Sequence, residues 1–94
     1  MTVSTHVLDT EQGRPAAGIL VELYRDGELV GTGVTDTDGR IRELAKGDAG
    51  TYRIVFHPAS PFFRRVELEV ELGEGHYHVP LLVSSYACAT YRGS

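Results

Sequence analysis

Residues 64–72 read RRVELEVEL, and this stretch decides the fold class of the chain. Its aliphatic side chains fall at every second position, with glutamates between them. In an extended strand successive side chains point to opposite faces, so this pattern predicts a β-strand with one apolar and one charged face. The apolar face, which we expect to enter the core, carries Val66, Leu68, Val70 and Leu72.

Runs of the same kind recur along the chain and are separated by turn signals. Asp26-Gly27 is a favoured two-residue hairpin turn between two such runs, and it predicts adjacent antiparallel strands. In TDTDGR, residues 35–40, the Asp36 and Asp38 side chains can cap a turn and Gly39 accepts a positive φ. No helical periodicity competes with this pattern. We therefore expect an all-β sandwich or barrel of about eight short strands with little or no helix. The eight runs are VSTHVLD, GILVELYR, ELVGTGVT, IREL, TYRIVFH, RRVELEVEL, HYHVPLLVS and YACATYR.

Length and charge limit the function classes. Ninety-four residues suffice for one domain, residues 1–94, whose core is too modest to enclose a deep cavity. A site for a small molecule would therefore lie in a surface cleft or between subunits. Nine basic residues against thirteen acidic residues give a net charge of −4 without a basic stripe, so we expect no nucleic-acid partner.

The chain also carries no sign of membrane insertion or export. No apolar stretch approaches the roughly 20 residues of a membrane-spanning helix, and the N-terminus does not resemble a secretory signal. The single cysteine, Cys88, cannot form an internal disulfide. We therefore expect a cytoplasmic protein that does not bind membranes.

The histidines fall on faces that point away from the core. In residues 76–83, HYHVPLLV, the apolar side chains alternate with His76 and His78, so both imidazoles should point outward. In residues 3–8, VSTHVL, His6 shares the outward face with Ser4. Each histidine could be only a solvated or cross-strand hydrogen-bonded residue. A metal site is disfavoured because no third histidine or cysteine stands at a suitable spacing.

Five segments together resemble a known family. They are STHVLD, GRPAAG, TDTDGR, HYHVPLL and the terminal TYRGS, and they occur in this order over nearly the whole chain. In that order they resemble the signature segments of the transthyretin-related 5-hydroxyisourate hydrolases. Transthyretin carriers share the fold of these enzymes but lack the YRGS ending, so the last residues favour a hydrolase over a carrier.

The resemblance implies a transthyretin-like two-sheet β-sandwich that assembles as a homotetramer, a dimer of dimers. It implies hydrolysis of 5-hydroxyisourate to 2-oxo-4-hydroxy-4-carboxy-5-ureidoimidazoline in urate degradation, without a metal or another cofactor. The family's catalytic positions fall on His6, Arg40, His78 and Tyr91. His6, Arg40, Tyr91 and Ser94 are expected to bind the substrate, and His76 is expected only to support the site.

The residue types suit this reaction. An imidazole can exchange protons near neutral pH, and a guanidinium can stabilise developing negative charge. The sequence does not assign the acid and base roles between His6 and His78. Two other classes remain open: a non-catalytic transthyretin-like binding protein, and a structural sandwich module of the adhesin type.

The chain departs from the family pattern in two places. Family members usually carry a short helix before the RRVELEVEL run, where this chain has only PASP, residues 58–61. The tail reads YACATYRGS where many relatives have YGYSTYRGS, which places Ala87, Cys88 and Ala89 near the expected site.

Overall fold

The structure, a computed structural model, describes all of residues 1–94 and contains ten strands and no helix. It offers no helix with the length and apolarity that crossing a bilayer requires. The strands are β1 (Thr2–Asp9), β2 (Arg14–Pro15), β3 (Leu20–Arg25), β4 (Glu28–Val34), β5 (Arg40–Lys46), β6 (Gly50–His57), β7 (Val66–Leu72), β8 (His76–His78), β9 (Leu81–Val83) and β10 (Cys88–Thr90).

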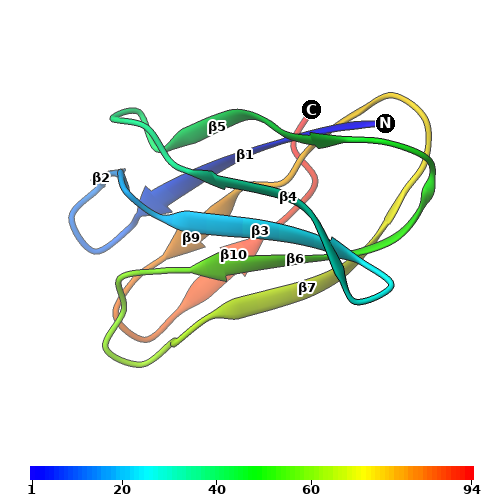
Figure 1. Cartoon of the computed structure of the whole chain (residues 1–94). Helices are drawn as coiled ribbons and strands as arrows, with labels where there is room; N and C mark the ends of the chain where they lie inside the picture. The colour runs from blue at the N-terminus through cyan, green and yellow to red at the C-terminus, as the bar shows by residue number, and fades with distance from the viewer.

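Two sheets pack against each other (Figure 1). The smaller sheet is antiparallel, in the order β4-β3-β6-β7. The larger sheet has the path β10-β9-β1-β2, and β5 and β8 also pair with β1. The first half of β1 lies between β5 and β8, and its second half lies between β2 and β9. The expected all-β, two-sheet sandwich without helix is confirmed.

The chain forms ten strands where we expected about eight. The run HYHVPLLVS was predicted as one strand, but it forms β8 and β9 with Val79 and Pro80 between them. Proline has no N–H to donate to a ladder, so pairing is interrupted there. The other additional strand is β2, a two-residue pairing of Arg14 and Pro15 with the end of β1.

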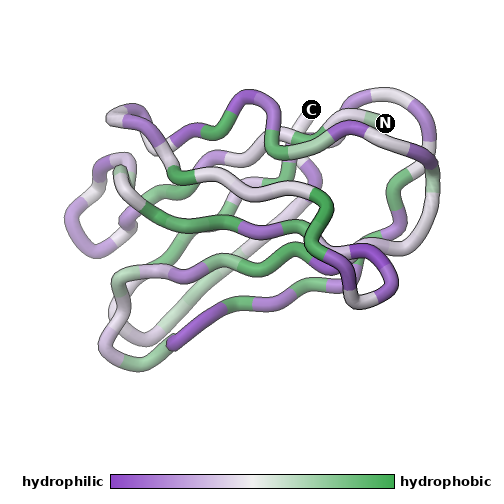
Figure 2. The backbone as a smooth tube through the Cα atoms, viewed as in Figure 1, coloured by the Kyte–Doolittle hydropathy of each residue, from purple (hydrophilic) through white to green (hydrophobic).

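The core lies between the sheets and follows the period-two pattern. Figure 2 shows apolar and polar residues alternating along the strands, most clearly along β7. Phe56, Leu23 and Ile54 from the smaller sheet are fully buried against Val3 and Val7 of β1. The apolar side chains of β7 pack against this core, whereas its glutamates lie on the charged outer face, as predicted.

The predicted hairpin turn is confirmed. Asp26 and Gly27 connect β3 to β4 and have φ values of 51° and 81°. Positive φ at both central residues is the geometry of a type I′ turn, which matches the twist of antiparallel strands.

Candidate active site

The outward face of β1 gathers the predicted histidines. Thr2, Ser4 and His6 alternate with the buried Val3, Thr5 and Val7. Parallel pairing with β8 places Thr2 beside His76 and Ser4 beside His78. Antiparallel pairing with β5 places His6 opposite Arg40. Three of the four predicted catalytic residues therefore lie on one face of the larger sheet.

A polar groove of about 230 Å³ lies on this face. Its lining is Ser4, Thr5, Arg40, Ile41, Arg42, His76 and His78. A larger groove of about 390 Å³ lies between β7 and the C-terminal tail, and its lining is mostly apolar. The polar groove is the better candidate for hydrolysis because it carries imidazoles and guanidinium groups. No group of three or more His, Cys, Asp or Glu side chains is arranged to hold a metal ion.

The turn before β5 positions Arg40. The Asp36 carboxylate accepts hydrogen bonds from the backbone N–H groups of Asp38 at 2.9 Å and Arg40 at 3.0 Å. These bonds, the one from Arg40 first, lower the pKa of Asp36. Gly39 has a φ of 75°, as the sequence predicted. The turn thus delivers Arg40 to the position opposite His6.

The same turn orients His6. The Asp38 carbonyl oxygen lies 2.8 Å from Nε2 of His6. A carbonyl oxygen can only accept, so Nε2 carries a hydrogen and donates it. In the neutral imidazole the other nitrogen, Nδ1, is then left with a lone pair.

Strand β5 contains a β-bulge beside the groove and contributes two guanidinium groups to it. Val3 pairs with Ala45 and Thr5 with Ile41, so the ladder advances two residues along β1 and four along β5. The additional residues lie opposite Ser4 and bend β5 there. Arg40 and Arg42 both line the groove, because they flank the buried Ile41 and residues two apart in a strand share a face.

Ser4 connects the two histidines of β8. Its Oγ lies 2.8 Å from Nε2 of His76 and 2.8 Å from Nδ1 of His78. The other nitrogen of His76, Nδ1, lies 2.6 Å from the hydroxyl of Thr2. Both nitrogens of His76 are therefore engaged, whereas His78 engages Nδ1 and leaves Nε2 without a hydrogen-bond partner in the chain.

The surroundings of His78 favour its neutral form. Burial lowers the pKa of His78, and the neighbouring Arg40, His6 and His76 lower it further. No carboxylate lines the groove to oppose this effect. His78 is therefore largely unprotonated at neutral pH, which is the state that a general base requires.

The C-terminal tail is held against β8. The backbone N–H of Gly93 donates to the carbonyl of His78 at 2.7 Å, and the Arg92 guanidinium lies 4.3 Å from the centre of the Tyr77 ring. A terminal Arg92 nitrogen also donates to the His76 carbonyl at 3.4 Å. The last residues are thus ordered by contacts within one chain.

Tyr91 and Ser94 lie outside the polar groove in the single chain. Tyr91 is 57% exposed and lines the larger apolar groove beside β7. Ser94 is exposed at the end of the tail, and neither side chain makes a hydrogen bond. Their predicted part in the site stays a prediction.

Gly93 approaches His78 so closely that no side chain fits there. A Cβ at position 93 would lie 2.6 Å from Cδ2 of His78. We expect Gly93→Ala to displace the ring or the tail and to lower kcat/KM roughly tenfold or more, because small misplacements of reacting groups are costly. Steady-state kinetics would measure this loss. The control is Gly47→Ala, where the nearest atom lies at 3.5 Å. Equal activity of both variants would contradict the expectation.

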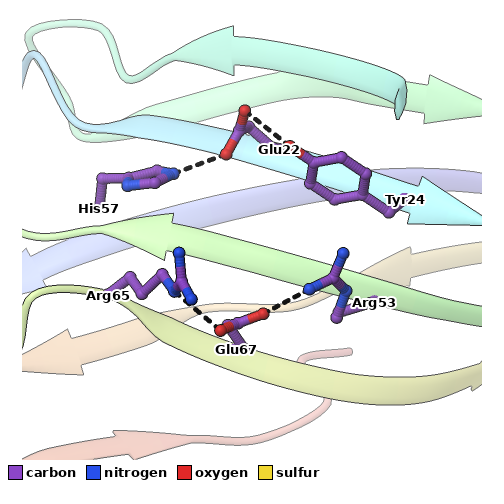
Figure 3. Close-up of polar contacts among 6 residues, drawn as sticks. All are labelled: Glu22, Tyr24, Arg53, His57, Arg65 and Glu67. Carbon is purple, nitrogen blue, oxygen red and sulfur yellow. Dashed lines mark hydrogen bonds and ion pairs between the residues drawn. The ribbon is translucent and has the colours of Figure 1, made fainter. Parts of the chain in front are cut away.

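The remaining histidine, His57, lies on the other sheet. Figure 3 shows its ring bonded to Glu22, which also accepts from Tyr24, and shows Glu67 between Arg53 and Arg65. The hydrogen bond from His57, followed by the one from Tyr24, lowers the pKa of Glu22. These side chains hydrogen-bond and form ion pairs with one another on the outer face of the smaller sheet, and none of them lines the polar groove.

The site also contains residues that sequence reasoning did not select. Ser4 and Thr2 join the histidines, and Arg42 joins Arg40. The alternation of β1 placed Ser4 on the correct face. No local signal showed that β8 would lie beside it.

Comparison with known proteins agrees with this architecture. The model of the HIUase/Transthyretin family matches residues 3–93. The chain belongs to this family. It is 41% identical to "5-hydroxyisourate hydrolase 2" of Rhizobium meliloti, over 98% of this chain and 95% of that protein. That alignment extends over 114 positions, so the relative contains residues that this shorter chain lacks.

Solved structures of family members superpose closely on the chain. The structure of Klebsiella pneumoniae 5-hydroxyisourate hydrolase gives a TM-score of 0.90 at 36% identity and covers 99% of this chain and 98% of that one. Sea bream transthyretin in complex with thyroxine gives 0.84 at 28% identity and covers 97% and 93%. A 5-hydroxyisourate hydrolase and a transthyretin in complex with thyroxine therefore share this fold, so the site must distinguish the two functions.

Proposed function

We propose that the chain hydrolyses 5-hydroxyisourate to 2-oxo-4-hydroxy-4-carboxy-5-ureidoimidazoline and needs no cofactor. The observation that carries this proposal is the convergence of His6, Arg40 and His78 on one polar face. Family relatives named as 5-hydroxyisourate hydrolases support the choice of substrate.

His78 acts as the general base in this proposal. Its Nδ1 is engaged by Ser4, so Nε2 is free to take a proton from water. The resulting hydroxide adds to the carbonyl carbon of the ring amide. A positioned base of this kind is typically worth about 10²–10⁴ in rate.

Arg40, on β5 across β1 from His78, and His6, on β1 itself, also act on the substrate. The oxygen of the attacked carbonyl becomes negatively charged, and the permanently charged guanidinium of Arg40 stabilises it. Nδ1 of His6 accepts a hydrogen bond from a ring N–H of the substrate and orients the ring. The C–N bond then breaks, and the leaving nitrogen receives the proton that the base took from water.

We also propose that the assembly is a homotetramer, a dimer of dimers. The smaller sheet ends at β7 and the larger sheet ends at β10, and the apolar groove lies between these open edges. A second copy pairing along both edges would extend both sheets and cover that groove. The apolar groove carries Tyr91, so pairing would order the Tyr91 side chain. A second dimer facing the polar face would enclose the site, with Tyr91 and Ser94 close to that site.

The assembly is tested by mass. Light scattering on the eluting protein should give about four times the chain mass of 10.3 kDa. An active species of single-chain mass would contradict the enclosed site.

Two further expectations belong to this proposal. We propose that residues 1–94 form one transthyretin-like hydrolase domain, which agrees with the family match over residues 3–93. We also propose a cytoplasmic location, where the exposed Cys88 would remain a free thiol.

The function is tested with freshly made substrate. Urate oxidase generates 5-hydroxyisourate from urate, and its absorbance decay is followed with and without the protein. Acceleration supports the hydrolase. A protein that binds urate in calorimetry yet leaves the decay at its spontaneous rate would be a non-catalytic transthyretin-like binding protein.

A further inference from the structure

A continuous hydrogen-bond chain connects the half-buried His78 to the protein surface. From outside inward it passes from Thr2 Oγ1 to His76 at 2.6 Å, from His76 to Ser4 Oγ at 2.8 Å, and from Ser4 Oγ to His78 at 2.8 Å. Thr2 and Ser4 come from one strand and the histidines from its parallel neighbour, so the sheet itself fixes the spacing.

Ser4 makes the direction of donation the same along this hydrogen-bond chain. A serine hydroxyl has one hydrogen, but Oγ of Ser4 contacts two imidazole nitrogens. When both imidazoles are neutral, Ser4 donates to one and accepts from the other. In one arrangement Nδ1 of His78 carries the hydrogen and Nε2 is a free base. In the other arrangement Nε2 carries it and cannot accept a proton.

The two imidazoles differ in how well they tolerate positive charge. His76 is exposed, whereas His78 is partly buried in a groove without a carboxylate. The cationic or titratable groups around the two rings come from β1, β5, β8 and the tail: His6, Arg40, Arg42, Lys46 beside Thr2, and Arg92. A proton left on His78 would face the two groove arginines, whereas one on His76 is stabilised by water.

We infer that Ser4 passes a proton from His78 to His76, so that the charge produced by base catalysis is held on the exposed imidazole. This inference rests on the proposed function for its substrate. Nε2 of His78 takes a proton from water, and Nδ1 of His78 gives its own proton to Oγ of Ser4. The hydroxyl proton of Ser4 passes to Nε2 of His76, whose Nδ1 keeps its proton and donates to Thr2. Water becomes hydroxide, His76 becomes an imidazolium, and His78 stays neutral. When the C–N bond breaks, Nε2 of His78 gives its proton to the leaving nitrogen, and the transfer through Ser4 runs back so that His76 becomes neutral again.

The hydrogen-bond chain predicts how activity depends on pH. With Ser4 present, a proton on His76 turns the Ser4 hydroxyl toward Nδ1 of His78. The hydrogen of His78 then lies on its Nε2, which can no longer act as a base. Activity therefore falls with the titration of the coupled pair. In Ser4→Ala, His78 must hold the proton alone. Because burial and Arg40 lower the pKa of His78, the acidic limb of the rate profile should move to lower pH. The weaker isolated base should also lower the plateau of kcat by about 10–100-fold.

Kinetics of three variants test the transfer. Ser4→Ala and His76→Gln should both lower the plateau and shift the acidic limb downward, whereas Ser4→Thr retains a hydroxyl and should keep the wild-type profile. His76→Gln changes an exposed side chain, so the test stands even where Ser4→Ala folds poorly. A lower rate with an unmoved limb in both variants would show that the residues only support the structure, and it would overturn the inference.

Nitrogen NMR of the imidazoles tests the hydrogen-bond chain independently of the hydrolysis reaction. In the wild-type protein the hydrogen on His78 should move from Nδ1 to Nε2 as the pH is lowered, and Ser4→Ala should abolish this coupling. An active protein without the coupling would refute the relay and leave the hydrolase proposal intact. Coupling in a protein that does not accelerate 5-hydroxyisourate decay would refute the catalytic role and leave the hydrogen-bond chain in place.

Discussion

Replacing His78 with alanine is expected to lower kcat/KM for 5-hydroxyisourate by about 10²–10⁴, the range usual for a positioned base. The variant removes the imidazole whose Nε2 is free and whose pKa is lowered by burial. Its fold should survive because His78 is only partly buried at the edge of the polar groove. The measurement is the initial rate of absorbance decay at several substrate concentrations.

His57→Ala provides the matched control. This histidine lies on the outer face of the smaller sheet, bonded to Glu22 at 2.6 Å (Figure 3). It has no connection to the polar groove, so its loss should leave kcat/KM near the wild-type value. Comparable losses in the two variants would mean that the polar groove is not the site.

The largest effect on stability is expected from Phe56→Ala. Phe56 is fully buried near the end of β6, between Val21 of β3 and Val66 of β7. Truncation of a buried phenylalanine removes contacts and leaves a cavity, which costs about 3–5 kcal/mol. Small proteins have only about 5–15 kcal/mol of stability in total, so the variant should be close to unfolding at 37 °C. The midpoint of urea unfolding measures the change.

Phe62→Ala is the control for this prediction. Phe62 is 63% exposed and contacts mainly Phe63 and Tyr86 at the surface. Its truncation should change the free energy of unfolding by much less. Both variants must be compared at one protein concentration, because assembly also contributes to apparent stability. A similar loss in both would contradict the position of the core between the sheets.

Local patterns sufficed for much of the fold. Alternation in β7 and β3 identified the buried faces, and Asp26-Gly27 and TDTDGR identified two turns. These features depend on residues close together in the sequence. Pro80 is a local signal as well: it interrupts the run HYHVPLLVS, so two strands form where the alternation alone predicts one.

The site was predictable only in part. Alternation showed that His6, His76 and His78 point outward, and the family resemblance selected His6, Arg40 and His78. The link through Ser4 depends on parallel pairing of β1 with β8, across more than seventy residues of sequence. That link has no local sequence signal, because it arises when distant strands meet. The second guanidinium, Arg42, could have been found from the sequence, because Arg40 and Arg42 flank the buried Ile41 and therefore share a face.

The most direct test is the rate of 5-hydroxyisourate decay at increasing concentrations of the wild-type protein. The proposed function predicts that the first-order rate constant rises in proportion to protein and that a single product, the ureidoimidazoline carboxylate, accumulates. A rate constant that stays at the spontaneous value over the whole concentration range would contradict it.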